Sequence, residues 1–297
     1  MTVNPRIVVG VDGSPSSTCA VRWAAEAAAR HNAPLLLVSG VTVPVSLGGI
    51  GDVGLPQSFY DDQEAESARK LREAAVLAHA TAPGAELSVT SERASTPAVD
   101  ALIERSKDAR MVVLGSRGLG EFTGGLIGSV TSALAHHAHC PVAVIRDRVN
   151  PTDGTALGPV VVGVDGSADS VSAIAVAFEE ASLRSTDLVA VHAWSDVTLS
   201  TWTAHDQGLP WESIESAEQA TLAESLAGYT EQYPDVAVTK VVVEDRPLNH
   251  LLSYGNTAQL LVVGSRGRGG FTSMLLGSTS TALLHATEGP LLIVRPT

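Results

Sequence analysis

Short apolar runs alternate along this chain with alanine-rich stretches of helical periodicity. Runs rich in valine, leucine and isoleucine predict strands in the first half near 6–12, 35–41, 86–92, 111–115 and 142–146. The stretches between them predict helices near 16–31, 62–80, 96–107 and 128–138. Because continuous apolar runs are typical of strands buried on both faces, we expect a parallel sheet covered by helices. Right-handed crossovers then give a doubly wound α/β sandwich.

The second half of the chain repeats this pattern. Its strands are predicted near 159–165, 188–194, 236–243, 260–264 and 290–295, and its helices near 169–184, 212–231, 247–256 and 277–287. The segment that ends in Val-Asp-Gly-Ser at residues 11–14 recurs at 164–167. A period of about 150 residues is too long for a solenoid and indicates a duplicated domain.

The duplication sets the expected domain organisation. We expect one domain over residues 1–146, a linker over 147–158 that contains Pro151 and Gly154, and a second domain over 159–297. Each domain is expected to be a doubly wound parallel sheet with strand order 3-2-1-4-5.

Composition narrows the class of protein. The 297 residues are 44% hydrophobic and 17% charged, which is typical of a packed globular protein. The net charge of −13 argues against nucleic acid and against an anionic membrane surface, since both attract basic surfaces. No apolar run approaches the roughly 20 residues of a membrane span, and no signal-peptide pattern is found, so we expect a cytoplasmic protein. Cys19 and Cys140 form no disulfide framework or metal motif.

Each half has one long connection, directly after its second predicted strand. Residues 42–60 are rich in glycine, and residues 195–211 carry Trp202 and Trp211. Loops of this length serve as lids or binding loops, or are surface insertions, and the sequence leaves both interpretations open.

A glycine skeleton occurs once in each half after the fourth predicted strand. It reads Gly-x-x-Gly, nine residues, then Gly-Ser, with copies at 115–129 and 264–278. Glycines let the backbone approach a ligand closely, and a loop that leads into a helix N-terminus favours bound phosphate. The skeleton therefore predicts two phosphate-binding loops.

A second element of the predicted site is the aspartate at the end of each first strand, Asp12 and Asp165. Strands one and four flank the point where the winding of an open sheet reverses, which is where such sheets bind ligands. A carboxylate there can accept hydrogen bonds from ribose hydroxyls or an adenine amine. Alternatively, these aspartates cap the following helices.

Other side chains near the loops could complete the site. Arg117, Arg266 and Arg268 could offset phosphate charge or lie in solvent. Val41 and Trp194 end the second strands, where they could pack on a base. The P-loop motif is absent, and no G-x-G-x-x-G follows strand one, which argues against P-loop NTPases and Rossmann dehydrogenases.

A histidine cluster near residues 136–140 offers a weaker signal. His136 and Cys140 have the i, i+4 spacing of helical metal ligands, but imidazoles near a helix C-terminus explain the pattern as well. We expect no metal ligands here.

Taken together, the Val-Asp-Gly-Ser strand end and the spaced glycine skeleton resemble the ATP-binding class of universal stress proteins. The resemblance covers nearly the whole chain and implies two tandem domains of the adenine-nucleotide alpha-hydrolase-like fold. In that family the strand-one aspartate contacts the nucleoside, the end of strand two lies by adenine, and the glycine loop and Gly-Ser hold the phosphates. The implied ATP-binding residues are Gly10, Asp12, Val41, Gly115, Ser116, Arg117, Gly118, Gly128, Ser129, Val130, Gly163, Asp165, Trp194, Gly264, Ser265, Arg266, Gly267, Gly277, Ser278 and Thr279.

The resemblance also implies association through the last strands. Residues 141–145 and 290–294 are expected to pair as an internal pseudo-dimer, or chains to pair as a homodimer. The halves differ where Glu121 corresponds to Gly270 and where Val41 corresponds to Trp194, so equal affinity of the two sites is not expected.

The functional expectation is an ATP-binding regulatory protein of the stress response or dormancy, a nucleotide-dependent switch with catalysis at most weak. ATP, alone or with Mg²⁺, is the expected ligand. Two alternatives stay open at this point. One is a slow nucleotide hydrolase or nucleotidyl transferase that uses Asp12 or Asp165, and the other is a chaperone-like scaffold that binds nucleotide incidentally.

Overall fold

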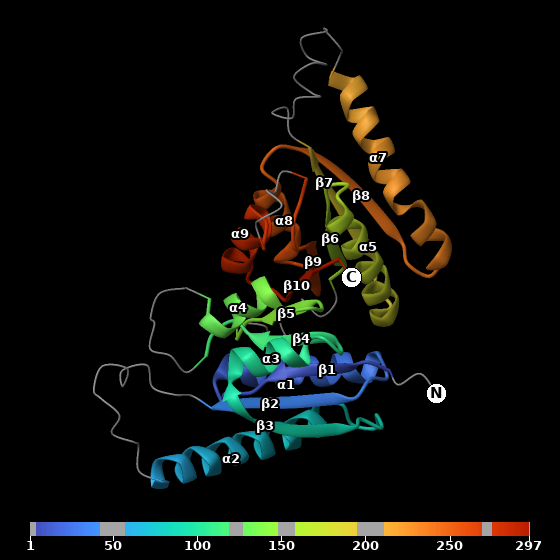
Figure 1. The fold of residues 1–297 in the computed structure, drawn as a ribbon. Coiled ribbons are helices and arrows are strands. Elements are labelled where there is room, and N and C mark those ends of the chain that lie inside the picture. The colour runs from blue at the N-terminus through green and yellow to red at the C-terminus, as the bar shows by residue number, and fades with distance from the viewer. Residues whose placement is uncertain are drawn as a thin grey trace, which may run out of the picture. The chain divides into compact units, whose positions relative to one another are not determined.

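The computed structural model contains two compact units, Met1–Asp147 and Arg148–Thr297, which correspond to the two halves (Figure 1). It describes residues 4–41, 57–118, 127–147, 158–194, 211–268 and 275–296. Glu121, Gly270 and most of the two long connections lie outside these residues.

The first half is a parallel five-stranded sheet with the order β3-β2-β1-β4-β5, which confirms the expected order. Helices α1 and α2 contact each other, as do α3 and α4, so the sheet is wound on both faces. The elements are β1 (Arg6–Gly10), α1 (Pro15–Arg30), β2 (Leu35–Val41), α2 (Gln57–Thr81), β3 (Val89–Pro97), α3 (Ala98–Arg105), β4 (Ala109–Gly115), α4 (Ser129–His137) and β5 (Val142–Ile145).

The second half repeats the same winding with the order β8-β7-β6-β9-β10, again parallel. Helix α5 contacts α7 and helix α8 contacts α9, so the two helical layers recur. The elements are β6 (Val160–Val164), α5 (Ala168–Arg184), β7 (Leu188–Trp194), α7 (Trp211–Gln232), β8 (Val238–Glu244), α8 (Pro247–Gly255), β9 (Leu260–Gly264), α9 (Ser278–Ala286) and β10 (Leu291–Val294).

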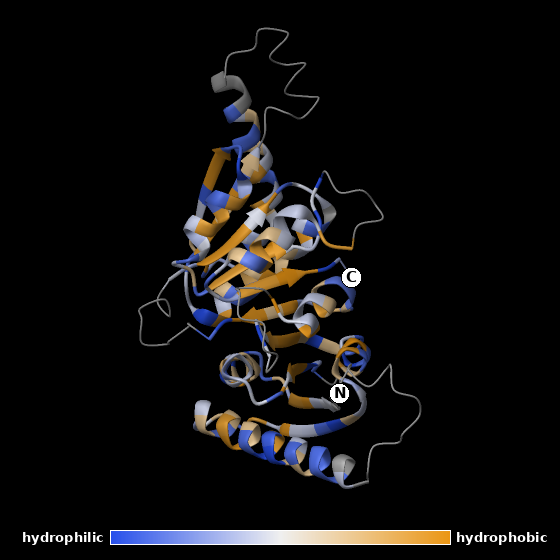
Figure 2. Ribbon diagram, turned by 90° about the vertical axis from the view of Figure 1, so that its left-hand side faces the viewer, coloured by the Kyte–Doolittle hydropathy of each residue, from blue (hydrophilic) through white to orange (hydrophobic). Residues whose placement is uncertain are grey.

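The central strands form the core of each half. Every residue of β5 and of β10 is buried, and hydrophobic residues follow the strands in Figure 2. Alanines of α1 from Ala20 to Ala28 lie against this sheet with almost no exposure. Their small side chains let the helix approach the strands closely, which explains the alanine-rich helical pattern.

Several strand boundaries differ by a few residues from those expected, and those of β1 and β3 have a clear physical reason. β1 ends at Gly10, two residues before Asp12, because Gly13 has φ +84° and turns the chain into α1. β3 begins at Val89 and continues to Pro97 rather than covering 86–92. It is an edge strand whose residues are mostly exposed, so its register follows pairing with β2 and not an apolar run.

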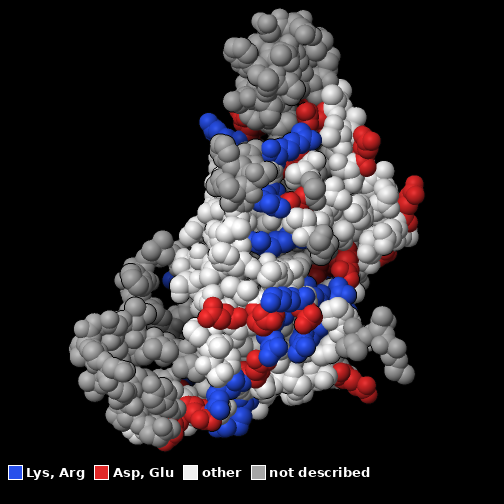
Figure 3. Space-filling model, viewed as in Figure 1, with Lys and Arg blue, Asp and Glu red and all other residues white. Residues whose placement is uncertain are grey.

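Charged side chains of both signs are mixed on the surface. Figure 3 shows lysines and arginines beside aspartates and glutamates on the face in view. Arg69 of α2, for example, bonds Glu66 and Glu73. No helix of the described residues combines the length and apolar character needed to cross a membrane.

The two cysteines are expected to differ in reactivity. Cys140 is 5% exposed, and burial raises the pKa of its thiol to about 12. Cys19 is partly exposed, and burial raises its pKa as well. Since the thiolate is the nucleophile, a maleimide or disulfide reagent at neutral pH should modify Cys19 first. Mass mapping of partly modified native protein checks this, and faster modification of Cys140 would contradict the described burial.

Candidate functional site

The candidate site of the first half begins at the turn between β1 and α1. Asp12 lies in this turn, where its Oδ1 accepts a hydrogen bond from the Ser14 N–H at 2.9 Å. Ser14 is the N-cap of α1, and its Oγ accepts the Ser17 N–H at 3.1 Å. The capping role therefore belongs to the serine, and the second carboxylate oxygen of Asp12 faces the glycine loop.

The glycine loop lies directly against this turn. A methyl group built on Gly118 would lie 2.6 Å from Asp12 Oδ2, and one built on Gly115 would lie 2.6 Å from the carbonyl carbon of Ser16. The missing side chains thus provide the space in which the carboxylate and the start of α1 sit. Asp12 and the glycine loop therefore meet at the reversal point of the sheet, as the sequence predicts.

Hydrogen bonds close the loop onto α4. The Gly128 N–H donates to Ser116 O at 2.9 Å, and Thr131 Oγ1 donates to Gly115 O at 2.7 Å. Ser14 Oγ donates to Arg117 O at 3.3 Å and so ties the loop to the first turn. α4 has Gly128 as its N-cap and no side-chain capping bond. Its N-terminus is therefore the uncapped helix end of the site, with a partial positive charge.

A cavity of about 610 Å³ lies between these elements. Eight of the ten residues expected in the first half line it, namely Gly10, Asp12, Gly115, Arg117, Gly118, Gly128, Ser129 and Val130. Ser116 does not line it and is fully buried, and only the backbone of Val41 is described, paired with Pro97.

Sequence reasoning missed the apolar part of the cavity. Val38 and Gly40 of β2, and Ala98 and Leu102 of α3, line this part. Ala98 and Leu102 have the i, i+4 spacing of one helix face, which is the signal that could have identified them.

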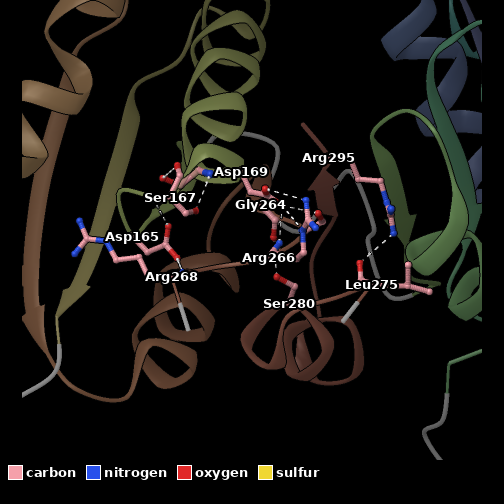
Figure 4. A network of polar contacts seen from close by, with 11 residues as sticks. Asp165, Ser167, Asp169, Gly264, Arg266, Arg268, Leu275, Ser280 and Arg295 are labelled. Carbon is pink, nitrogen blue, oxygen red and sulfur yellow. Dashed lines mark hydrogen bonds and ion pairs between the residues drawn. The ribbon is translucent and has the colours of Figure 1, made fainter. Parts of the chain in front are cut away.

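The second half brings Asp165 and its glycine loop together in the same way. Asp165 Oδ1 accepts the Ser167 N–H at 2.9 Å, and a methyl group on Gly267 would lie 2.4 Å from Asp165 Oδ2. That oxygen also accepts the Arg268 N–H at 2.9 Å (Figure 4).

The loop of the second half is closed like that of the first. The Gly277 N–H donates to Ser265 O at 2.8 Å, and Ser280 Oγ donates to Gly264 O at 2.7 Å. Ser278 and Thr279 begin α9, whose N-cap Gly277 makes no side-chain capping bond. Gly163 packs against Leu251 of α8.

Trp194 ends β7 as expected, and it is 9% exposed. Its carbonyl accepts the Asp245 N–H at 2.7 Å, an interaction that the sequence did not suggest.

One member of the histidine cluster has a partner on its own helix. His136 Nδ1 lies 2.7 Å from Ser132 O one turn earlier in α4. Within the described ranges, no group of three histidine, cysteine, aspartate or glutamate side chains is placed to hold a metal ion.

Comparisons with known proteins identify the family of the chain. The profile of the Universal stress protein family matches residues 4–146 and 157–295, so the chain belongs to this family. Universal stress protein Rv2623 of Mycobacterium tuberculosis is 42% identical over 290 residues, covering 97% of this chain and 96% of the relative. Universal stress protein Rv2005c of the same organism is 46% identical over 292 residues, covering 97% and 96%.

Solved structures support the fold. The crystal structure of a universal stress protein from Archaeoglobus fulgidus superimposes with a TM-score of 0.70 at 19% identity, covering both chains completely. At that identity the likeness shows the fold, and the family match confirms the membership of the universal stress protein family that the sequence motifs implied.

Proposed function

We propose that this universal stress protein binds ATP at the carboxyl edge of the sheet in each half and acts as a nucleotide-dependent switch. The observation that carries the proposal is the two-part character of the first-half cavity. One part is apolar, with Val38, Ala98 and Leu102, and suits the faces of a purine base. The other part is the glycine loop and the uncapped start of α4, which suits phosphates.

The residues between these parts suit a ribose. Asp12 has a carboxylate oxygen beside Gly118, where it can accept a hydroxyl hydrogen bond. Because Gly118 has no side chain, the Asp12 carboxylate can lie directly beside the glycine loop. Mg²⁺ would enter the site together with the nucleotide, on its phosphates.

The same geometry favours a switch over a turnover enzyme. Among the described lining residues, Asp12 is the one carboxylate, and no histidine or lysine lines the cavity. Within this described lining, the candidate general base for hydrolysis is Asp12. Steady ATP turnover that Asp12→Asn abolishes, with nucleotide binding retained, would favour the enzyme instead.

The test of the proposed function is direct. Mass spectrometry of denatured, freshly purified protein should detect an adenine nucleotide, and calorimetry should detect ATP binding to nucleotide-free protein. ATP at 100 times its Kd should stabilise the half that binds it by about 2.7 kcal/mol in denaturant unfolding. Absence of both co-purified nucleotide and calorimetric ATP binding would overturn the proposal.

A further inference from the structure

Equivalent places in the two halves hold different residues, Ser16 in α1 and Asp169 in α5. Both residues lie in the first turn of their helix and pack against the first glycine of the loop. A methyl group on Gly115 would lie 2.8 Å from Ser16 Cβ, and one on Gly264 would lie 3.1 Å from Asp169 Cβ. The second half therefore has a carboxylate beside its glycine loop where the first half has a hydroxyl.

Asp169 binds the start of the second glycine loop through several donors. Its Oδ2 accepts hydrogen bonds from Ser265 Oγ at 2.8 Å, from the Arg266 N–H at 3.0 Å and from Arg266 Nε at 3.3 Å. The Asp169 side chain is only 8% exposed and that of Arg266 is 39% exposed, so solvent reaches this ion pair from the arginine side and hardly from the carboxylate side. Figure 4 shows the Arg266 guanidinium turned toward Asp169.

A second arginine, Arg295, adds positive charge that the Asp169 carboxylate offsets. Burial and the positive charge of Arg266 lower the pKa of Arg295, and Asp169 acts in the opposite direction. Arg295 also donates to Leu275 O at 3.3 Å, near the end of the same loop. Two neighbouring arginines repel each other, so the negative charge of Asp169 stabilises Arg266 in its place.

The described residues of the first half have a hydroxyl and no carboxylate at this place, although Arg146 corresponds to Arg295. Ser116, which corresponds to Ser265, has a buried Oγ with no hydrogen-bond partner in the described structure. Arg117, which corresponds to Arg266, lines the cavity. Its ion pair with Asp147 is 3.7 Å long and both side chains are more than a third exposed, a geometry that contributes little stability.

We propose that Asp169 makes Arg266 a structural arginine that holds the second loop, whereas Arg117 is the arginine that contacts nucleotide phosphates in the first half. The inference rests on the proposed function, because it assumes that both sites bind ATP. It assigns Asp169 as the residue that makes the two phosphate sites different, although their glycine skeletons are identical.

The binding test uses variants in which one site is closed. With the second site closed by Gly267→Ala, Arg117→Gln should weaken ATP binding about tenfold, the effect of losing a charge-assisted hydrogen bond. With the first site closed by Gly118→Ala, Arg266→Gln should weaken it less than about twofold, because Ser265 Oγ and the backbone N–H of residue 266 still bind Asp169 and keep the loop in place. When Asp169→Ser is added to the protein with the closed first site, Arg266→Gln should weaken ATP binding about tenfold. Equal losses at the two sites in otherwise native protein would overturn the proposal.

A double-mutant cycle tests the structural part without any nucleotide. Asp169→Asn and Arg266→Gln, singly and together, should show a coupling of about tenfold in the unfolding equilibrium constant. The matched cycle of Asp147→Asn and Arg117→Gln should show less than about twofold. If ATP binds neither site, the proposed function fails, but this cycle still tests whether Asp169 holds Arg266. A coupling between Asp169 and Arg266 no larger than that between Asp147 and Arg117 would overturn the structural role of Asp169.

Discussion

Replacement of Gly118 by alanine is expected to abolish ATP binding by the first half, with a loss of affinity of about 100-fold or more. The added Cβ would lie 2.6 Å from Asp12 Oδ2, far inside van der Waals contact. Asp12 cannot simply withdraw, because its other oxygen accepts the Ser14 N–H at 2.9 Å in a tight turn. The substitution therefore displaces the carboxylate and narrows the loop at the same time.

Calorimetry checks this prediction through the number of ATP sites. The native chain should titrate as two sites and the Gly118→Ala protein as one, with an unchanged circular dichroism spectrum. Gly228→Ala in α7 is the matched control, since nothing lies within 4 Å of its added methyl group. A Gly118→Ala protein that still binds two equivalents with native affinity would show that the loop and Asp12 do not form the site.

The arrangement of Gly118 and Asp12 could be predicted because it follows from topology. Alternating strands and helices determine a doubly wound sheet, and in such a sheet the carboxyl ends of strands one and four are neighbours at the reversal point. The repeat made this argument stronger, since both halves carry the same residues at the same places. The strand order and the meeting of loop and aspartate needed no side-chain detail.

The features that topology does not determine were missed. Asp169 resembles an ordinary first-turn acid that complements the helix dipole, and nothing in the sequence connects it with Arg266, 97 residues away. The apolar end of the cavity depends on how α3 packs on β2; the i, i+4 spacing of Ala98 and Leu102 indicates a shared helix face but not the strand that this face meets. The β3 boundary depends on pairing with β2, because the strand is an exposed edge with weak apolar alternation.

The second large effect is expected at Phe178 of α5, where alanine should lower the free energy of unfolding of the second half by about 3–5 kcal/mol. Phe178 is fully buried and stacks on Tyr229 and Tyr233, with ring centroids 5.6 and 5.8 Å away. These stacks attach the C-terminal part of α7 to the core. Truncation leaves a cavity that the two tyrosines cannot fill without moving the helix.

Comparison of the two halves sharpens this prediction. Ala25 takes the corresponding place in α1 and is itself fully buried, so alanine is compatible with the fold at this position when the neighbouring helix is packed for it. The cost of Phe178→Ala therefore comes from the mismatch with α7 and not from the helix itself. Phe178→Leu, which keeps most of the volume, should cost less than about 1.5 kcal/mol.

Denaturant unfolding of the native, Phe178→Ala and Phe178→Leu proteins measures these differences in the free energy of unfolding. Because Phe178, Tyr229 and Tyr233 all belong to the second unit, ATP binding by the first half should survive in the Phe178→Ala protein. Equal stability of the alanine and leucine variants would mean that side-chain carbons beyond Cβ contribute nothing to stability at this position, which would contradict the prediction. If Phe178→Ala destabilises the second half and also abolishes ATP binding by the first half, the two units do not fold independently.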